Sequence, residues 1–471
     1  MNFRSPSRIF ATVVSCWLAA ATAPAQPGAG SDSRPSFLPF RYDEDWSSLA
    51  GAKRTDWLDA LKYISLGRTG WFATVGGEIR ERYELLDHTN FGAGPEDGNG
   101  YFLQRYLLSS DFHFGPNLRV FTELQSGLEN GRNGGPRPTD LDRLDGHQGF
   151  LEWKMFSSDR YALRIRVGRQ ELGFGSGRLI SPAEGLNLRR SMDGVRLLLK
   201  TGKLDWNVLA LRLVKSSPGV FDDVPDHAQS FWGVGFTTKH PVWRNANVAV
   251  YYYGLDRKNS VFEKGVGRAI RHTIGSRSWK ATRNWDFNYE AIVQWGSFEG
   301  RPIRAWALSQ DTGHTFGELR FRPRVGVRAD VASGDGGPGE KKLGSFDPLF
   351  PAAPVYSGPS ALLGPTNLID FTPSMRLQLR KAVSLVLESS SFWRENPGDG
   401  IYSPFVTPVR HGASNQARYV ATAPSATISW QATRHTFYSV IYTHFVTGKF
   451  LEQAPPNRDV NYVAAWVSYR F

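Results

Sequence analysis

The stretch "LRFRPRVGVRAD", residues 319–330, alternates arginine with apolar side chains and constrains the fold more than any other feature of the chain. Arg320, Arg322, Arg324 and Arg328 share one parity, and Leu319, Phe321, Val325 and Val327 share the other. A helix would spread these charges around its axis, whereas a strand sorts them onto one face. The segment therefore predicts either a soluble sandwich with its arginines in water or a membrane barrel with its arginines in the lumen.

The N-terminus favours export from the cytoplasm. Arg4 and Arg8 precede an apolar run over residues 9–21, and Ala23-Pro24-Ala25 offers a small-residue cleavage site, so residues 1–25 are expected to be a signal peptide. A lipoprotein signal ending at Cys16 is the weaker alternative. Residues 26–70 are expected to form a periplasmic or plug segment, with a short helix within residues 43–66.

The chain lacks the features of a helical membrane protein. No later segment approaches the roughly 18 consecutive apolar residues of a spanning helix. Cys16 is the single cysteine, so the expected mature chain contains neither disulfides nor cysteine metal ligands. If the chain lies in a membrane it must close into a barrel, because only closure satisfies every backbone group in lipid.

From residue 72 onward, short alternating segments are separated by turns. The predicted strands are 72–83, 101–114, 117–127, 148–156, 161–169, 193–200, 203–213, 229–239, 246–254, 267–279, 285–297, 302–312, 318–330, 369–380, 382–393, 417–431, 434–446 and 461–471. Short and long connections alternate between them, as in an up-and-down outer-membrane barrel spanning residues 71–471. The connection at 298–301 is short where a long one is expected, so 16 or 20 strands remain alternatives to 18.

The last segment, "YVAAWVSYRF", places Val463, Ala465, Val467 and Tyr469 on one parity with the terminal Phe471. An aromatic last residue after alternating apolar positions is typical of the strand that outer-membrane barrels present to their assembly machinery. Aromatic residues make up 13% of the chain, which suits the girdles at the two membrane interfaces. These features predict an all-β transmembrane barrel in the outer membrane of a Gram-negative cell.

Arginine outnumbers lysine 42 to 14 in a chain with a formal net charge of +12. Guanidinium groups bind carboxylate and phosphate through paired hydrogen bonds, so this preference indicates anion recognition. Charged side chains cost about 2–4 kcal/mol near the midplane on the lipid face, which favours the lumen. The predicted lumen set is Arg80, Arg82, Arg164, Arg166, Arg169, Arg189, Arg190, Arg196, Arg320, Arg322, Arg324, Arg328, Arg376 and Arg380. The alternative is that lumen acids such as Glu123 and Asp330 pair with these arginines and merely fill the barrel.

Two longer stretches carry a family resemblance. "GRQELGFGSGRLISPAEGLNLRRSMDGVR", residues 168–196, and "SGDGGPGEKKLGSFDPLFPAAPVY", residues 333–356, resemble the bacterial alginate-export family of outer-membrane barrels. The resemblance implies an eighteen-stranded pore whose electropositive constriction passes an anionic uronic-acid polymer, and it places Arg169, Arg189 and Arg190 within the family pattern. Loop 331–368 is long enough either to fold inward as a gate or to remain an external loop.

Other functions are compatible with parts of the sequence. A general or nutrient-specific anion porin shares the expected fold and charge, and an outer-membrane enzyme is the minor alternative. The ten histidines show no metal-ligand spacing, and neither a cofactor nor a metal is predicted. The expected partners are an anionic polysaccharide or small anion, outer-membrane lipid and lipopolysaccharide, the assembly machinery and periplasmic export proteins, whereas nucleic acid is not expected.

Overall fold

The computed structural model describes residues 34–337, 339–358, 360–412 and 415–471. The expected signal peptide, residues 1–25, lies outside the described residues. Among the described residues, no helix has the length and apolar character needed to cross a membrane.

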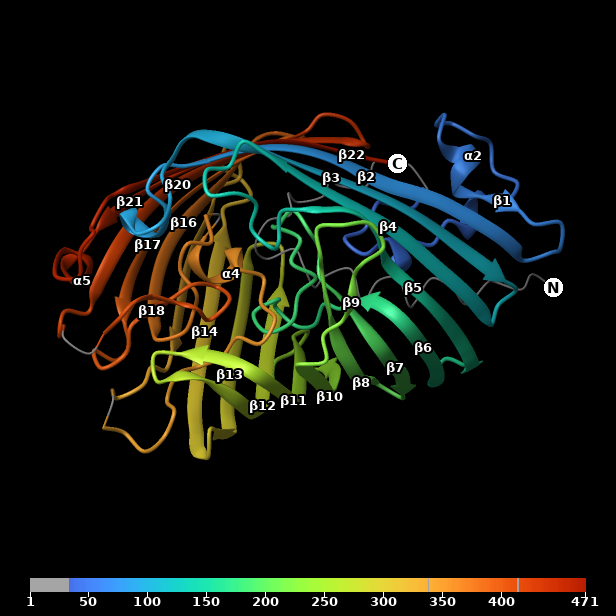
Figure 1. The fold of residues 1–471 in the computed structure, drawn as a ribbon. Coiled ribbons are helices and arrows are strands. Elements are labelled where there is room, and N and C mark those ends of the chain that lie inside the picture. The colour runs from blue at the N-terminus through green and yellow to red at the C-terminus, as the bar shows by residue number, and fades with distance from the viewer. Residues whose placement is uncertain (1–33, 338, 359, 413–414) are drawn as a thin grey trace.

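Eighteen antiparallel strands form one closed barrel (Figure 1), which confirms the predicted fold and strand number. The strands are β2 (Trp71–Leu86), β3 (Asp97–Phe114), β4 (Leu118–Asn130), β5 (Asp142–Ser157), β6 (Tyr161–Glu171), β7 (Ser191–Thr201), β8 (Leu204–Lys215), β10 (Gln229–Lys239), β11 (Asn247–Phe262), β12 (Gly265–Ala281), β13 (Trp285–Phe298), β14 (Arg301–Thr315), β15 (Arg324–Ala332), β16 (Leu368–Arg380), β17 (Val383–Arg394), β20 (Tyr419–Gln431), β21 (Thr436–Thr447) and β22 (Val460–Arg470). β22 closes the barrel on β2, from Glu78 opposite Arg470 to Leu86 opposite Tyr462.

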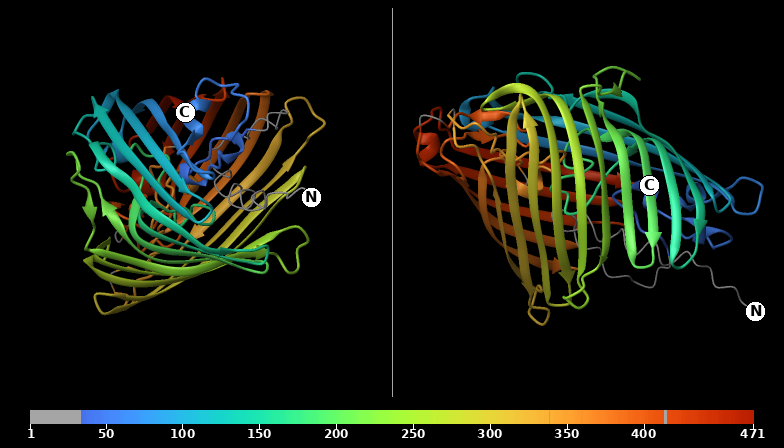
Figure 2. Two further views of the ribbon diagram at one scale, coloured as in Figure 1. Left: turned by 90° about the vertical axis from the view of Figure 1, so that its right-hand side faces the viewer. Right: turned by 90° about the horizontal axis from the view of Figure 1, so that it is seen from below.

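The connections differ between the two ends of the barrel. One, the short-turn end, carries turns such as 115–117 and 202–203, and the other, the loop end, carries segments such as 172–190 and 333–367. The short helices α2 (Asp59–Lys62) and α5 (Lys449–Glu452) lie at these opposite ends (Figure 1). Two further views show the wall of the barrel and the N-terminal segment at the short-turn end (Figure 2).

Three expectations about element boundaries are wrong. β15 begins at Arg324 rather than at residue 318, because Phe321 and Arg322 adopt positive φ angles that end the strand pattern. The expected long connection 255–266 is mostly strand, with residues 263–264 forming a tight turn. The expected helix within 43–66 is reduced to α2, preceded by the 3-10 turns η2 (Arg41–Asp43) and η3 (Ser47–Leu49). Tyr42 and Trp46 are buried against the barrel, so tertiary burial overrides local helix preference.

The two faces of the wall follow the alternation of the sequence. On β13, Ile292 points inward and is 2% exposed, whereas the next residue, Val293, points outward and is 53% exposed. The inward face of this side packs against loops that enter the barrel, forming an apolar cluster with Phe231, Tyr251 and Phe350 among its members. Smaller elements complete the fold at the loop end: α3 (Thr89–Gly92), β9 (Val224–Pro225), α4 (Pro354–Ser357), β18 (Ile401–Tyr402) and β19 (Pro408–Arg410). At the other end, β1 (Ile64–Ser65) pairs with β2.

Candidate functional site

The connection between β6 and β7, loop 172–190, is bound on one side by arginines of β2 and β3. Arg80 donates to the backbone oxygens of Glu184 and Leu186 at 3.1 and 2.5 Å. Arg82 donates to the Gly185 oxygen at 2.8 Å, and Arg105 also contacts the Glu184 and Leu186 oxygens. Guanidinium groups thus satisfy three successive carbonyl oxygens that would otherwise lie unpaired inside the barrel.

The same loop contacts the opposite side of the barrel. Arg178 pairs with Asp330 of β15 at 3.1 Å, and Ser176 hydrogen-bonds Glu290 of β13. Counted around the circle from β2, β13 is the eleventh strand and β15 the thirteenth of eighteen, so they lie across the lumen from β2 and β3. Loop 172–190 therefore crosses the lumen and narrows it.

Loop 333–367 folds inward against this crossing segment. The Phe350 amide donates to the Leu179 oxygen at 2.8 Å, and the Ser181 amide donates to the Phe350 oxygen at 2.9 Å. The Tyr356 hydroxyl donates to the Arg178 oxygen at 2.9 Å. Of the two alternatives for this loop, inward folding is the one that the structure adopts.

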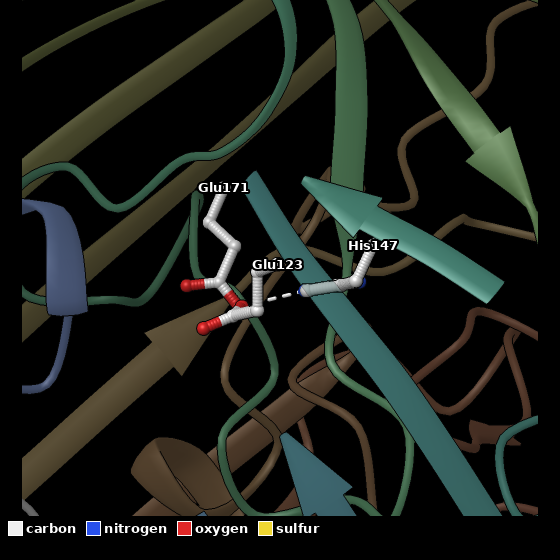
Figure 3. Close-up of side chains that lie close together, drawn as sticks. All are labelled: Glu123, His147 and Glu171. Carbon is white, nitrogen blue, oxygen red and sulfur yellow. Dashed lines mark hydrogen bonds and ion pairs between the residues drawn. The ribbon is translucent and has the colours of Figure 1, made fainter. Parts of the chain in front are cut away.

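A buried cluster holds the start of loop 172–190. Glu171 accepts hydrogen bonds from Arg189, and His147 Nε2 lies 2.8 Å from its Oε1 (Figure 3). Glu123 lies beside them and accepts a 2.8 Å hydrogen bond from Gln148. These three side chains have the types and proximity of a metal site. The Arg189 guanidinium already occupies both oxygens of Glu171, so the cluster serves as an ion-pair anchor for the loop.

The N-terminal segment, residues 34–62, fills part of the lumen beside the crossing loop. Tyr42 donates to the Glu171 backbone oxygen at 3.1 Å and packs edge-on against Phe121 and Phe150. The guanidinium of Arg166 lies 4.3 Å from the centre of the Tyr42 ring. Burial is the main reason that the pKa of Tyr42 is raised to about 12, which keeps its hydroxyl a hydrogen-bond donor.

Several of the predicted lumen arginines are paired with lumen acids. Arg164 and Arg166 share Glu152, with the shortest contact at 2.6 Å. Arg324 binds Asp286 at 2.5 Å and Asp311 at 3.1 Å, and Arg328 binds Asp370 at 3.0 Å. The alternative of structural pairing therefore holds for these positions, and they contribute little net positive charge to the lumen.

Four inward arginines of the predicted set, Arg80, Arg190, Arg196 and Arg376, form no ion pair within 4 Å in the described part of the chain, and Arg80 is committed to the loop carbonyls described above. Arg376 lies on the inward parity of β16. The carboxylates of Asp286, Asp311 and Glu388 attract its charge, but only from beyond ion-pair distance. Arg196 of β7 contacts the neutral Asn207. Arg190 donates to the Ser181 oxygen at 3.1 Å and lies over the Phe350 ring. Burial first, and then the nearby Arg257, lower the pKa of Arg190 to about 10, which leaves it charged at neutral pH.

Four of the predicted positions do not line the lumen. Arg320 and Arg322 are exposed in the turn before β15, and Arg380 is exposed where β16 ends at the short-turn end. Arg169 lies on the opposite parity of β6 from Arg164 and Arg166, and it pairs with Asp193 at 3.0 Å at the loop end. Two physical reasons apply. Arg320, Arg322 and Arg380 lie before or at the end of their strands, where the lumen-facing pattern stops, and Arg169 lies on the outward parity of β6.

Two lumen arginines outside the predicted set, Arg105 and Arg271, lie among apolar neighbours on their strands. Arg105 shares its inward parity with Leu103 and Leu107, which are 1% and 4% exposed and pack inside the barrel. Arg271 on β12 shares its inward parity with the apolar Ala269 and with the small polar Thr273. At these positions the inward face of the strand does not alternate as polar, because loops that enter the barrel pack against it and bury apolar inward side chains. Both Arg105 and Arg271 could have been placed in the lumen from the outward apolar residues of their strands, because every residue of the other parity faces inward.

Comparisons with solved structures give the same architecture. A BenF-like porin from Pseudomonas fluorescens aligns with a TM-score of 0.58 and 11% identity, over 85% of this chain and 98% of that chain. OccK2 of Pseudomonas aeruginosa, solved in complex with glucuronate, aligns with a TM-score of 0.55 and 10% identity over the same shares. OccK11 of the same organism gives 0.54 and 11%, over 85% and 96%.

No curated protein matches the chain. A family model described as "Alginate export" matches residues 72–465, which is nearly the whole barrel. The matched residues include all but the first and last few residues of the barrel wall that the porins share. The chain is an outer-membrane β-barrel of the channel type, and it belongs to the alginate export family.

Proposed function

We propose that this channel passes an anionic polysaccharide such as alginate outward through its lumen. The observation that carries the proposal is a group of three inward arginines, Arg190, Arg196 and Arg376, that have no carboxylate within 4 Å among the described residues. Membership of the alginate export family supports a uronic-acid polymer as the substrate class.

The arrangement suits transport better than tight binding. Arg190 and Arg196 lie just before and on β7, and Arg376 lies on β16, so a polyanion can exchange contacts between these two regions of the lumen. Charges within about 8–10 Å act together at physiological ionic strength, and low-dielectric walls strengthen their field. Loop 172–190 forces the polymer to pass close to this field, because it crosses the lumen.

A porin for small acidic solutes is the second candidate function. OccK2, which shares the fold, was solved with glucuronate, and OpdK of Pseudomonas aeruginosa was solved with vanillate. Both ligands are carboxylic acids, which the same unpaired arginines would recognise. Fold and family are those of channels, so an enzyme is the minor alternative. Lipopolysaccharide, the assembly machinery and periplasmic export proteins belong to the proposal as partners.

Single-channel recording in a planar bilayer tests the proposal. We expect an anion-selective current that oligouronides block, with the blocking concentration falling as the oligomer lengthens from monomer to octamer. Arg376→Ala and Arg190→Ala should each weaken the block about threefold to tenfold. Arg380→Ala is the matched control, because Arg380 is exposed at the short-turn end.

The outcomes separate the candidates. Block that is equally strong for monomer and octamer would favour the small-acid porin. An anion current indifferent to every uronide would contradict both functions. Complete absence of current would mean that the N-terminal segment and the loops seal the lumen, and a channel function would then need an opening partner.

A further inference from the structure

A cluster of carboxylates lies at the loop end of the barrel, apart from the lumen arginines. Asp142 and Asp145 belong to the first residues of β5, and Asp223 belongs to the connection 216–228 after β8. One oxygen from each residue lies within 4.8 Å of the other two. Two oxygens bound to one Ca²⁺ at 2.3–2.6 Å lie at most about 5 Å apart, so this spacing fits a single calcium ion.

Asp142 supplies a second and independent observation. Its side chain is fully buried, and neither carboxylate oxygen has a hydrogen-bond partner of normal geometry. The Leu144 amide is its one favourable backbone neighbour, whereas Asp145, Asp222 and Asp223 all repel its charge. A buried carboxylate without a partner is costly, and a cation held between the acids would remove that cost.

The other two acids have part of their coordination capacity free. Asp145 accepts the Asp223 amide at 3.0 Å through Oδ2 and the Gly146 amide at 2.7 Å through Oδ1. Asp223 accepts the Ser217 amide at 2.7 Å through Oδ1 and the Ser216 hydroxyl at 3.2 Å through Oδ2, so each oxygen keeps one lone pair for a cation. Burial first, and also the nearby Asp145, raise the pKa of Asp223. Arg169 is a cation beside the cluster, but it binds Asp193 at 3.0 Å and reaches Asp145 only at 3.7 Å. One guanidinium does not neutralise the group formed by Asp142, Asp145, Asp193, Asp222 and Asp223.

We propose that Asp142, Asp145 and Asp223 form a binding site for a hard divalent cation, Ca²⁺ by preference. Carboxylate oxygens are the ligands of Ca²⁺, and its flexible coordination tolerates a site built from a strand end and a loop, whereas Mg²⁺ demands regular octahedral geometry. Long loops face the exterior in outer-membrane barrels, so the site would be open to external calcium.

The cation would fasten one loop across the rim. Connection 216–228 already contacts β5 through the Phe221 amide, which donates to the Leu144 oxygen at 2.9 Å. This contact passes over the ends of β6 and β7, where loop 172–190 turns into the lumen. The contrast with Glu123, His147 and Glu171 is instructive, because there Arg189 fills the position that a metal would take.

Calcium titration of the full-length barrel tests the site. The protein is refolded in detergent free of lipopolysaccharide, whose phosphates bind calcium themselves, and titrated by calorimetry after EDTA treatment. We expect one saturable site with half-saturation at about 0.1–1 mM, the range of extracellular calcium modules. Ca²⁺ should bind at least tenfold more tightly than Mg²⁺ and should raise the unfolding temperature.

Isosteric variants make the test specific. Asp142→Asn and Asp223→Asn should weaken calcium binding at least tenfold, whereas Glu452→Gln, on another loop at the same end, should leave it unchanged. In EDTA, Asp142→Asn should be at least as stable as the unaltered protein, because one repelling charge is gone. Absence of saturable binding, or an equal calcium response in Asp142→Asn, would overturn the proposal. Folding of each variant is checked by heat-modifiable gel mobility, which is independent of calcium.

Discussion

At the scale of single residues, the partner of each arginine decides its role. Arg166 and Arg376 both project inward, yet Arg166 is held by Glu152 whereas Arg376 forms no ion pair within 4 Å among the described residues. The first contributes to the packing of the lumen, and the second leaves its charge available to a solute. A count of arginines overstates the positive field, because ion pairing with lumen acids cancels part of it.

Arg166→Ala should lower the free energy of unfolding by about 1–3 kcal/mol, because buried Glu152 would lose its 2.6 Å contact and keep only the longer one to Arg164 at 3.3 Å. Urea unfolding in detergent micelles measures this. The double variant Arg166→Met with Glu152→Leu should recover most of the loss. A loss below about 1 kcal/mol would mean that lumen water already screens the pair as it does at a surface.

Asp399, in the connection 395–418, should make the attachment of the loops depend on pH. It accepts hydrogen bonds from Ser345 and the Asp335 amide, and burial is the main cause that raises its pKa to about 6. The neutral form is therefore favoured when the loops are docked. This contribution is complete below the unfolded value of about 4 and is lost as pH rises through 6.

Amide-exchange protection factors within 395–399 should accordingly fall between pH 4 and pH 7, after correction for intrinsic exchange. In Asp399→Asn the profile should be flat, because the amide does not titrate. A fall of the same size in Asp399→Asn would assign the effect to another group, such as Glu263, an acid that repels the charge of Asp399.

At the scale of elements, inserted segments define the narrow part of the barrel. Replacing residues 175–186 by a short Gly-Ser linker removes the segment that Arg80 and Arg82 hold across the lumen. We expect at least a twofold rise in single-channel conductance and loss of oligouronide block. The same replacement in the turn 241–244, at the short-turn end, is the control. Unchanged conductance would place the narrowest point at the N-terminal segment instead.

At the scale of the whole molecule, the even number of strands places the start of the first barrel strand, β2, and the end of the last, β22, at the same short-turn end. Lys341 is exposed on loop 333–367, and Arg320 is exposed on the turn before β15, so the two mark opposite sides of the membrane. Cysteine scanning is simple, because Cys16 is the single cysteine.

In a Cys16→Ser background, Lys341→Cys should react with a membrane-impermeant maleimide in intact cells. Arg320→Cys should react only after the outer membrane is opened. The reverse pattern would invert the barrel, and labelling of both positions in intact cells would contradict a sealed outer-membrane location.

The number of strands, and which side chains face lipid or lumen, could be predicted from the sequence. Side chains alternate between the two faces of a strand, and the lipid face tolerates few charges. All eighteen strands were predicted, and Val325 and Arg328 point outward and inward as expected. The family resemblance rested on residues 168–196 and 333–356, which prove to lie largely in the two loops that enter the lumen. Local pattern failed at Arg322, where a positive φ angle ends the strand pattern.

Sequence by itself determined a closed barrel with arginine facing its lumen, because closure and alternation are local requirements of a strand in lipid. Tertiary structure alone decided which arginines keep their charge free. That outcome depends on partners distant in the chain, such as Glu152 for Arg166 and Asp370 for Arg328. Ion pairing acts through space at a few ångströms, so no pattern along the chain encodes it.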